Sequence, residues 1–138
     1  MDLGSYTQFS ELPLAALEEL KAPVYILDFN WNYLFVNSFV AANLGTERDQ
    51  LIGQNMWETF SRLTVDPNFL KMKANTEKGQ HTSMVVTSPL TAKRMHITGR
   101  PLADCYAFVA SMLPNKNDLL QELRGALIKK NTEQMVVV

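Results

Sequence analysis

Two histidines and one cysteine are the side chains of this sequence best suited to bind a metal ion or to act as a nucleophile. A metal site needs several ligands at a recognisable spacing, and neither His81 nor His96 has an acidic or cysteine partner at such a spacing. Both histidines fall in predicted strands, beside polar residues. We therefore interpret them as exposed strand residues and predict no metal site.

The single thiol, Cys105, lies in an apolar stretch, where burial makes a cysteine unreactive. The sequence has no nucleophile elbow and no glycine-rich phosphate loop. Glu18 and Glu19 are neighbours on a predicted helix surface, which indicates solvated carboxylates. No catalytic residue and no enzymatic activity are predicted. An enzyme or a carrier of hydrophobic molecules would need polar groups inside a cavity, and Asp28 and His96 are the candidates for such a pair.

Methionines and aromatic residues form the more informative set. Methionine adapts to varied apolar ligands because its unbranched side chain is flexible and polarisable. One hypothesis is a small apolar or weakly polar ligand bound between helices and sheet, and the other is a filled core. The candidate lining residues are Met56, Phe60, Phe69, Met72, Met84, Met95 and Ile97.

The stretch from residue 23 to residue 60 predicts the elements that would position these side chains. Residues 24–29 and 33–36 are rich in β-branched and aromatic residues and predict a hairpin, with Asn32 as the turn residue suited to the left-handed conformation. Asn37 and Ser38 can cap a helix over 39–44 that Gly45 ends. Thr46 can cap a second helix over 47–52, and residues 56–60 form a third helical turn.

The rest of the chain predicts three more strands and three more helices. Strands are expected over 81–88, 94–101 and 105–113, the last apolar on both faces and so interior to the sheet. Helices are expected over 10–21, 68–78 and from Asn117 or Asp118 to Lys130, and 61–65 is expected to be loop. Together these elements predict an α+β fold with a five-stranded, mainly antiparallel sheet. The apolar side of the last helix comprises Leu119, Leu120, Leu123, Ala126 and Leu127.

The helix predicted over 10–21 has apolar residues on more than one side. Leu12, Ala16 and Leu20 fall on one face, while Leu14 and Leu17 fall on another. Leu14 and Leu17 are therefore candidates for a homodimer interface. Complete burial of the helix within one domain is the alternative.

The order of these elements resembles the PAS domain, a sensor and interaction module. Asp28 matches the family's aspartate before the first turn, and Val36 and Asn37 match the Val-Asn that closes its second strand. Gly45 and residues 49–53 match its glycine and its acidic-x-Leu-Ile-Gly step. Met56, Trp57 and Phe60 match its next apolar turn. Trp31 and Asn32 stand where the family often carries Asp-Gly.

The resemblance implies a PAS fold with short helices over one face of the sheet and flanking helices at both ends. The expected organisation is a flexible N-terminus over 1–9, a flanking helix over 10–21, a PAS core over 22–114, a C-terminal helix over 115–131 and a tail over 132–138. It also implies a sensory domain of a signal-transduction system, such as a two-component system, and the composition of the chain makes a cytoplasmic setting the default. Such a domain would form a homodimer, bind a small ligand and act on an output partner. A ligand-free dimerisation adaptor is the alternative.

The identity of any cofactor stays open, but two are disfavoured. The haem-ligating histidine of PAS domains generally lies on the pocket helix, and residues 68–78 contain none. The light-sensing subgroup needs an Asn-Cys-Arg context on that helix for its flavin adduct, whereas Cys105 follows Asp104 on a predicted strand.

Length and composition agree with one such domain. The chain has 138 residues, of which 46% are hydrophobic, enough for a single core. One cysteine excludes a disulfide within the chain. A net charge of -1 gives no basic surface for nucleic acid or an anionic membrane, and no apolar run reaches the ~20 residues of a membrane span. The first residues lack the pattern of a signal peptide.

Overall fold

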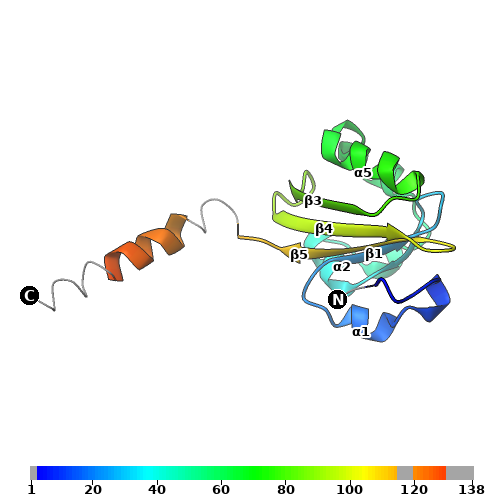
Figure 1. Cartoon of the computed structure of the whole chain (residues 1–138), viewed down its shortest axis with the longest axis horizontal. Coiled ribbons are helices and arrows are strands. Elements are labelled where there is room, and N and C mark those ends of the chain that lie inside the picture. Colours follow the sequence, from blue (N-terminus) through cyan, green and yellow to red (C-terminus); the bar gives the residue numbers. More distant parts are fainter. Residues whose placement is uncertain (1–2, 115–119, 130–138) are drawn as a thin grey trace, which may run out of the picture.

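Five antiparallel strands form one sheet, as the sequence predicts, and their order in the sheet is β2-β1-β5-β4-β3. The computed structural model describes residues 3–114 and 120–129. Figure 1 shows β3 above β4 and β4 above β5 and β1, with α5 at the top and α1 at the bottom. The strands are β1 (Val24–Leu27), β2 (Tyr33–Val36), β3 (Thr82–Thr87), β4 (Arg94–Pro101) and β5 (Tyr106–Met112).

Short helices connect the two halves of the sheet. They are α2 (Ser38–Leu44), α3 (Arg48–Leu51), α4 (Met56–Thr59), the 3₁₀ helix η2 (Ser61–Val65) and α5 (Pro67–Glu77). The predicted loop over 61–65 is therefore a 3₁₀ helix. Asn37 caps α2 and Gly45 ends it with φ 69°, both as predicted. The cap of α3 is Glu47, in a capping box with Gln50, and the prediction of Thr46 was wrong.

The sheet buries a separate apolar cluster on each face. The helix face, which includes Met95, Ile97 and Phe108, packs against α2, α4, η2 and α5. The outer face of β1, β2 and β5 packs against the N-terminal segment, with Ile26 and Leu17 fully buried between them. Strand β5 is central and buried on both sides, as its composition indicates.

The N-terminal segment differs from its prediction. In place of one helix over 10–21, the chain forms η1 (Phe9–Glu11) and α1 (Leu14–Glu18), because Pro13 lacks the N–H that a continuous helix would need. Leu3 is buried against the outer face, so packing begins within the stretch predicted to be flexible. Residues 120–129 are helical and exposed. The predicted caps Asn117 and Asp118, Leu119 and residues from 130 onward lie outside the described residues.

The first hairpin turn places Trp31 in the left-handed region, with φ 66°. The prediction that Asn32 fills this role was wrong by one residue. Bulky residues rarely adopt this conformation. Trp31 is held there because its ring is buried among Trp57, Tyr106 and Phe108, and because its Nε1 donates a hydrogen bond to Glu77 Oε1 at 3.1 Å.

Replacing Gly99 by alanine is expected to destabilise the fold by about 1–3 kcal/mol, the usual cost of overpacking a core. A Cβ at Gly99 would overlap the ring of the fully buried Phe108 and lie 2.8 Å from Thr82 Oγ1. Urea unfolding measures the loss. Gly125→Ala is the control, because a Cβ there meets nothing within 4 Å, and alanine favours a helix. Equal stability of Gly99→Ala and the wild type would contradict the packing.

Candidate functional site

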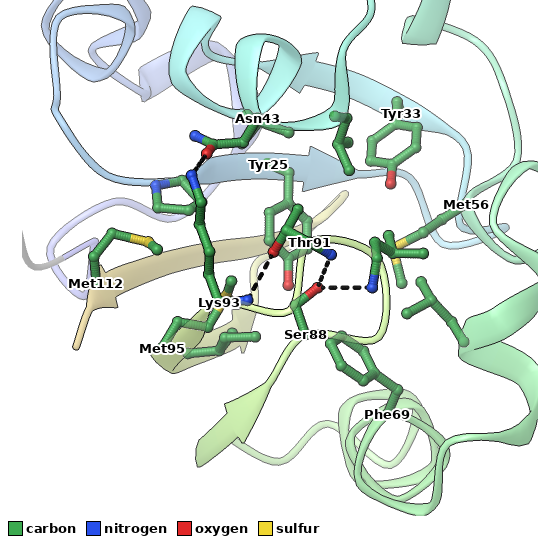
Figure 2. Close-up of a pocket in the computed structure, with 16 residues that line it drawn as sticks. Tyr25, Tyr33, Asn43, Met56, Phe69, Ser88, Thr91, Lys93, Met95 and Met112 are labelled. Atoms are coloured by element: carbon green, nitrogen blue, oxygen red, sulfur yellow. Dashed lines mark hydrogen bonds between the residues drawn. The ribbon is translucent and has the colours of Figure 1, made fainter. Parts of the chain in front are cut away.

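A cavity of about 80 Å³ lies between the helix face of the sheet and helices α2, α4 and α5. Figure 2 shows side chains from all of these elements converging on it. Apolar side chains make up most of its wall, which suits an apolar ligand. The lining residues are Pro23, Tyr25, Tyr33, Val40, Asn43, Leu44, Met56, Leu63, Phe69, Ser88, Leu90, Thr91, Lys93, Met95, Ile97 and Met112.

The loop between β3 and β4 forms one wall of the cavity. The buried Ser88 fixes its shape, because Ser88 Oγ accepts hydrogen bonds from the amides of Leu90 at 3.1 Å and Thr91 at 3.4 Å. Ala92 adopts φ 60°. Lys93 then donates a hydrogen bond from Nζ to Asn43 Oδ1 on α2, as Figure 2 shows. The loop is thus tied across the cavity to α2.

Two phenol groups add further polar atoms to the cavity wall. Tyr25 of β1 stacks on Phe108, with ring centroids 5.0 Å apart, and Tyr33 of β2 packs edge-on against Phe60. Burial raises the pKa of both tyrosines, and the neighbouring Tyr25 raises that of Tyr33 further. Both phenols therefore stay protonated at neutral pH and can donate hydrogen bonds.

The cavity helix α2 is joined to the N-terminal segment through Asn37. This side chain is fully buried, and its Nδ2 donates to the carbonyls of Leu17 at 3.1 Å and Ala22 at 2.8 Å. Its Oδ1 accepts from the amides of Val24 and Val40. One amide group thus binds the segment containing α1, strand β1 and the start of α2.

A second contact joins the same two elements at the surface. The Glu18 carboxylate of α1 accepts hydrogen bonds from the Ser38 amide at 2.9 Å and the Ser38 hydroxyl, and it pairs with Arg48 of α3. Burial alone would raise the pKa of Glu18. The hydrogen bonds from Ser38 and the charge of Arg48 outweigh this effect and hold the pKa below its ordinary value of 4.5.

The side chains with catalytic or metal-binding chemistry lie away from the cavity. Cys105 is fully buried, and burial, with the nearby Asp104, raises its pKa to about 12. His96 contacts Ser83, with His96 Nε2 and Ser83 Oγ 2.7 Å apart on the outer face, and Arg100 lies beside His81. Asp28 accepts hydrogen bonds within the first hairpin turn. The structure does not bring Asp28 and His96 together at the cavity.

Neither a metal centre nor a membrane span is evident in residues 3–114 and 120–129. Within these ranges, no three side chains of histidine, cysteine or acidic type gather closely enough to hold a metal ion. The helices described there also lack the combination of length and apolar character that crossing a bilayer requires.

Comparison with solved structures finds this arrangement in sensory proteins. The photoactive yellow protein domain of the sensor histidine kinase Ppr from Rhodospirillum centenum superposes with a TM-score of 0.60 at 16% identity, covering 74% of this chain and 94% of that one. The chain has a PAS fold. The PAS domain of BvgS from Bordetella pertussis gives a TM-score of 0.56 at 13% identity over 84% of this chain and 94% of that one.

A third solved structure contains a ligand. It is the PAS domain of the quorum-sensing receptor RpfR from Cronobacter turicensis in complex with BDSF, with a TM-score of 0.54 at 14% identity over 70% of this chain and 97% of that one. No protein-family model matches the sequence, and no curated protein is significantly similar to it.

Local features that carried the PAS resemblance have clear structural roles. Asp28 Oδ1 accepts from the amides of Asn30 and Asn32, each at 2.9 Å, and so shapes the first turn. Asn37 caps α2, and Gly45 and Gly53 both adopt positive φ. Each of these side chains or glycines meets a local backbone requirement, which explains why the sequence pattern was informative.

Four of the seven predicted lining residues face the cavity of this PAS fold: Met56, Phe69, Met95 and Ile97. Met72 is buried in the adjacent core, and Phe60 and Met84 pack against that core without lining the cavity. Sequence reasoning missed the polar groups of the wall. Tyr25 lies between two apolar residues and Tyr33 is followed by three, all in short strands, so only their hydroxyl groups distinguish them as candidates.

The contact of Glu18 with Ser38 and Arg48 predicts a pH-dependent stability. A carboxyl whose pKa is lowered on folding stabilises the fold above its unfolded pKa, near 4.5, and this contribution is lost as the pH falls through the lower folded value. Glu18→Gln should therefore cost about 1 kcal/mol at about pH 7 and much less at about pH 3.5.

Thermal unfolding at both pH values measures this difference. Glu19→Gln is the matched control, because Glu19 is the adjacent carboxylate and takes no part in the contact with Ser38 and Arg48. A cost of Glu18→Gln that is the same at both pH values, or is matched by Glu19→Gln, would contradict the role of the carboxylate.

Proposed function

We propose that this chain is a cytoplasmic sensory and protein-interaction domain of a signal-transduction system, and that it performs no catalysis. It binds a small apolar or weakly polar ligand in the cavity and responds through its flanking segments. The observation that carries the proposal is an apolar cavity lined in part by helix α2. Asn37, the N-terminal cap of α2, donates hydrogen bonds directly to the N-terminal segment. The single cysteine, which has no disulfide partner within the chain, supports a reducing compartment.

Sensory proteins among the structural neighbours support this proposal. PAS domains of similar fold occur in sensor histidine kinases, and the RpfR domain was solved with a ligand, BDSF. These neighbours share less than a quarter of their residues with this chain, so they support the class of function and leave the ligand open. A two-component system or another receptor pathway is the setting that we propose.

A ligand acts in this mechanism by favouring one arrangement of the flanking segments over another. It can shift that equilibrium only by the difference in its affinity for the two arrangements, which must reach about 1 kcal/mol to matter. Helix α2 contributes Val40, Asn43 and Leu44 to the cavity wall, and its N-terminal cap binds the carbonyls of Leu17 and Ala22. A displacement of α2 by ligand would therefore strain the attachment of the N-terminal segment.

The size of the cavity bears on which ligands it takes. An apolar cavity of roughly 150 Å³ takes up benzene, and the present one is about half that volume. A ligand larger than a few heavy atoms would therefore have to displace side chains. Met56, Met95 and Met112 line the cavity, and their flexible side chains make such an adjustment inexpensive.

The small volume also favours a second candidate, a dimerisation adaptor that binds no ligand. In that case the cavity is a packing imperfection, and the terminal segments act through association alone. Ligand binding and self-association are independent measurements, and together they separate the two functions.

Ligand binding is expected to appear as added mass in native mass spectrometry of gently purified protein, or as a raised melting temperature with members of a small-molecule library. A ligand at 100 times its Kd stabilises the folded state by about 2.7 kcal/mol. Val40→Phe, which fills the cavity, should abolish the effect. Val85→Phe is the control, because Val85 is 53% exposed. The absence of any added mass and of any thermal shift would leave the adaptor function.

Self-association through α1 is expected, and Leu14 is the residue that tests it. Leu14 is half-buried and borders a surface hollow with Leu34 and Ile52, whereas Leu17 is fully buried within the chain, so substituting it would disturb folding. Leu14→Asp should weaken a dimer by roughly thirtyfold, because association would bury a charge. Sedimentation measures this change.

Leu123→Asp on the exposed helix over 120–129 is the matched variant for the other flanking segment. Dissociation caused by Leu123→Asp and not by Leu14→Asp would move the interface to that helix. A purely monomeric wild type at high concentration would overturn the prediction.

A further inference from the structure

The hydroxyl groups of Tyr25 and Tyr33 point into the cavity and lack protein partners in the described part of the chain. Figure 2 shows both oxygens directed toward the space between the sheet and the helices, with no dashed line to either. Tyr33 is only 5% exposed. No hydrogen bond to the described residues engages either group, so within the cavity they can pair only with water or with a ligand. Both hydroxyl groups are therefore available to bind a ligand.

These two hydroxyl groups are neutral donors, and other polar groups of the wall are already engaged. Ser88 Oγ accepts from the amides of Leu90 and Thr91, and Asn43 Oδ1 accepts from Lys93. A ligand that brought a donor could pair with a phenol oxygen, but it would leave both phenol O–H groups without an acceptor. A ligand that brought an acceptor would pair with those O–H groups.

We propose that the cavity selects a small, neutral, largely apolar molecule with a carbonyl-type acceptor, which the hydroxyl groups of Tyr25 and Tyr33 hold. A carbonyl oxygen has two lone pairs and can accept two hydrogen bonds. This inference rests on the proposed function, since it names the class of ligand for the same cavity. The apolar remainder of the ligand packs against Met56, Phe69 and Ile97.

An anionic ligand is disfavoured by the position of the positive charge. Lys93 is the only charged residue among those lining the cavity, its side chain is exposed, and it is already bonded to Asn43. A carboxylate beside the phenols would be buried away from Lys93, and burying an unpaired charge costs far more than burying a neutral carbonyl.

Cyclopentanone and methylenecyclopentane form a matched pair of probes, because they have nearly the same shape. Cyclopentanone has a C=O group, which accepts hydrogen bonds, where methylenecyclopentane has C=CH₂. Cyclopentanecarboxylate is the anionic probe. Each is titrated by heteronuclear NMR into the wild type, Tyr25→Phe, Tyr33→Phe and Tyr6→Phe. The last is the control, because Tyr6 packs on the other side of the sheet. The melting temperature of each ligand-free variant is measured as well.

Cyclopentanone should bind the wild type, and each cavity substitution should raise its Kd by about three- to tenfold, the usual effect of one hydrogen bond. The same two substitutions should not weaken the binding of methylenecyclopentane. Tyr6→Phe should leave the Kd of both uncharged probes unchanged. Ligand-free Tyr33→Phe should melt no lower than the wild type, because it loses an unpartnered hydroxyl.

Two results would overturn this inference while the proposed function stands. One is that both uncharged probes bind and the Tyr→Phe substitutions leave the Kd of cyclopentanone unchanged. The other is that cyclopentanecarboxylate binds more tightly than cyclopentanone and loses that advantage in Lys93→Met. If no probe binds any variant, the cavity is packed core, and the ligand-binding part of the proposed function fails with the inference.

Discussion

The buried amide of Asn37 is the interaction on which the rest of this structure depends. Its Oδ1 accepts from the amides of Val24 at 3.2 Å and Val40 at 3.1 Å, and its Nδ2 donates to the carbonyls of Leu17 and Ala22. Buried amides such as those of Val24 and Val40 are rarely left without an acceptor in proteins, whereas the Leu17 carbonyl also accepts from the amide of Leu20. One buried side chain therefore contacts the start of β1, the start of α2 and the end of the N-terminal segment at once.

The opposite end of the helix layer is held by an aromatic cluster rather than by an amide. Trp31 occupies a left-handed position that glycine would occupy with less strain, so its packing must outweigh the conformational cost. Its ring lies 4.8 Å from that of Tyr106 and 5.5 Å from that of Trp57, and its Nε1 reaches Glu77 at the end of α5. This explains how the chain dispenses with the Asp-Gly turn often found in PAS domains. The turn residue itself becomes part of the core.

The strands and several helix caps and helix ends were predictable from the sequence. Which apolar side chains face the cavity and which lie in the surrounding core was not. The strands, the cap at Asn37 and the stop at Gly45 follow from side-chain alternation and backbone chemistry that act over a few residues. The break of the first helix at Pro13 was equally local, but the prediction placed Pro13 in the first turn of the helix, where proline is tolerated. Which apolar residues face the cavity depends on small rotations of packed helices. For that reason Met56 and Met95 line the cavity, whereas Met72, which was predicted with them, lies in the surrounding core.

The two walls of the cavity differ in how readily they can move. Strands β3, β4 and β5 form a continuous ladder in which a shift of one residue would break many hydrogen bonds. Helices α3 and α4 have only four residues each, and three backbone hydrogen bonds join Gly53, Gln54 and Met56 to Trp31 and Tyr33. The helix layer is thus held by fewer backbone bonds than the ladder, and it is the wall that adjusts more readily to an increase in cavity volume. Because α2 is anchored at its N-terminal end through Asn37, movement of its cavity-lining side chains must either pivot about that amide or carry the N-terminal segment with it. The geometry of one buried asparagine thus decides whether a change in the cavity stays local or reaches the edge of the domain.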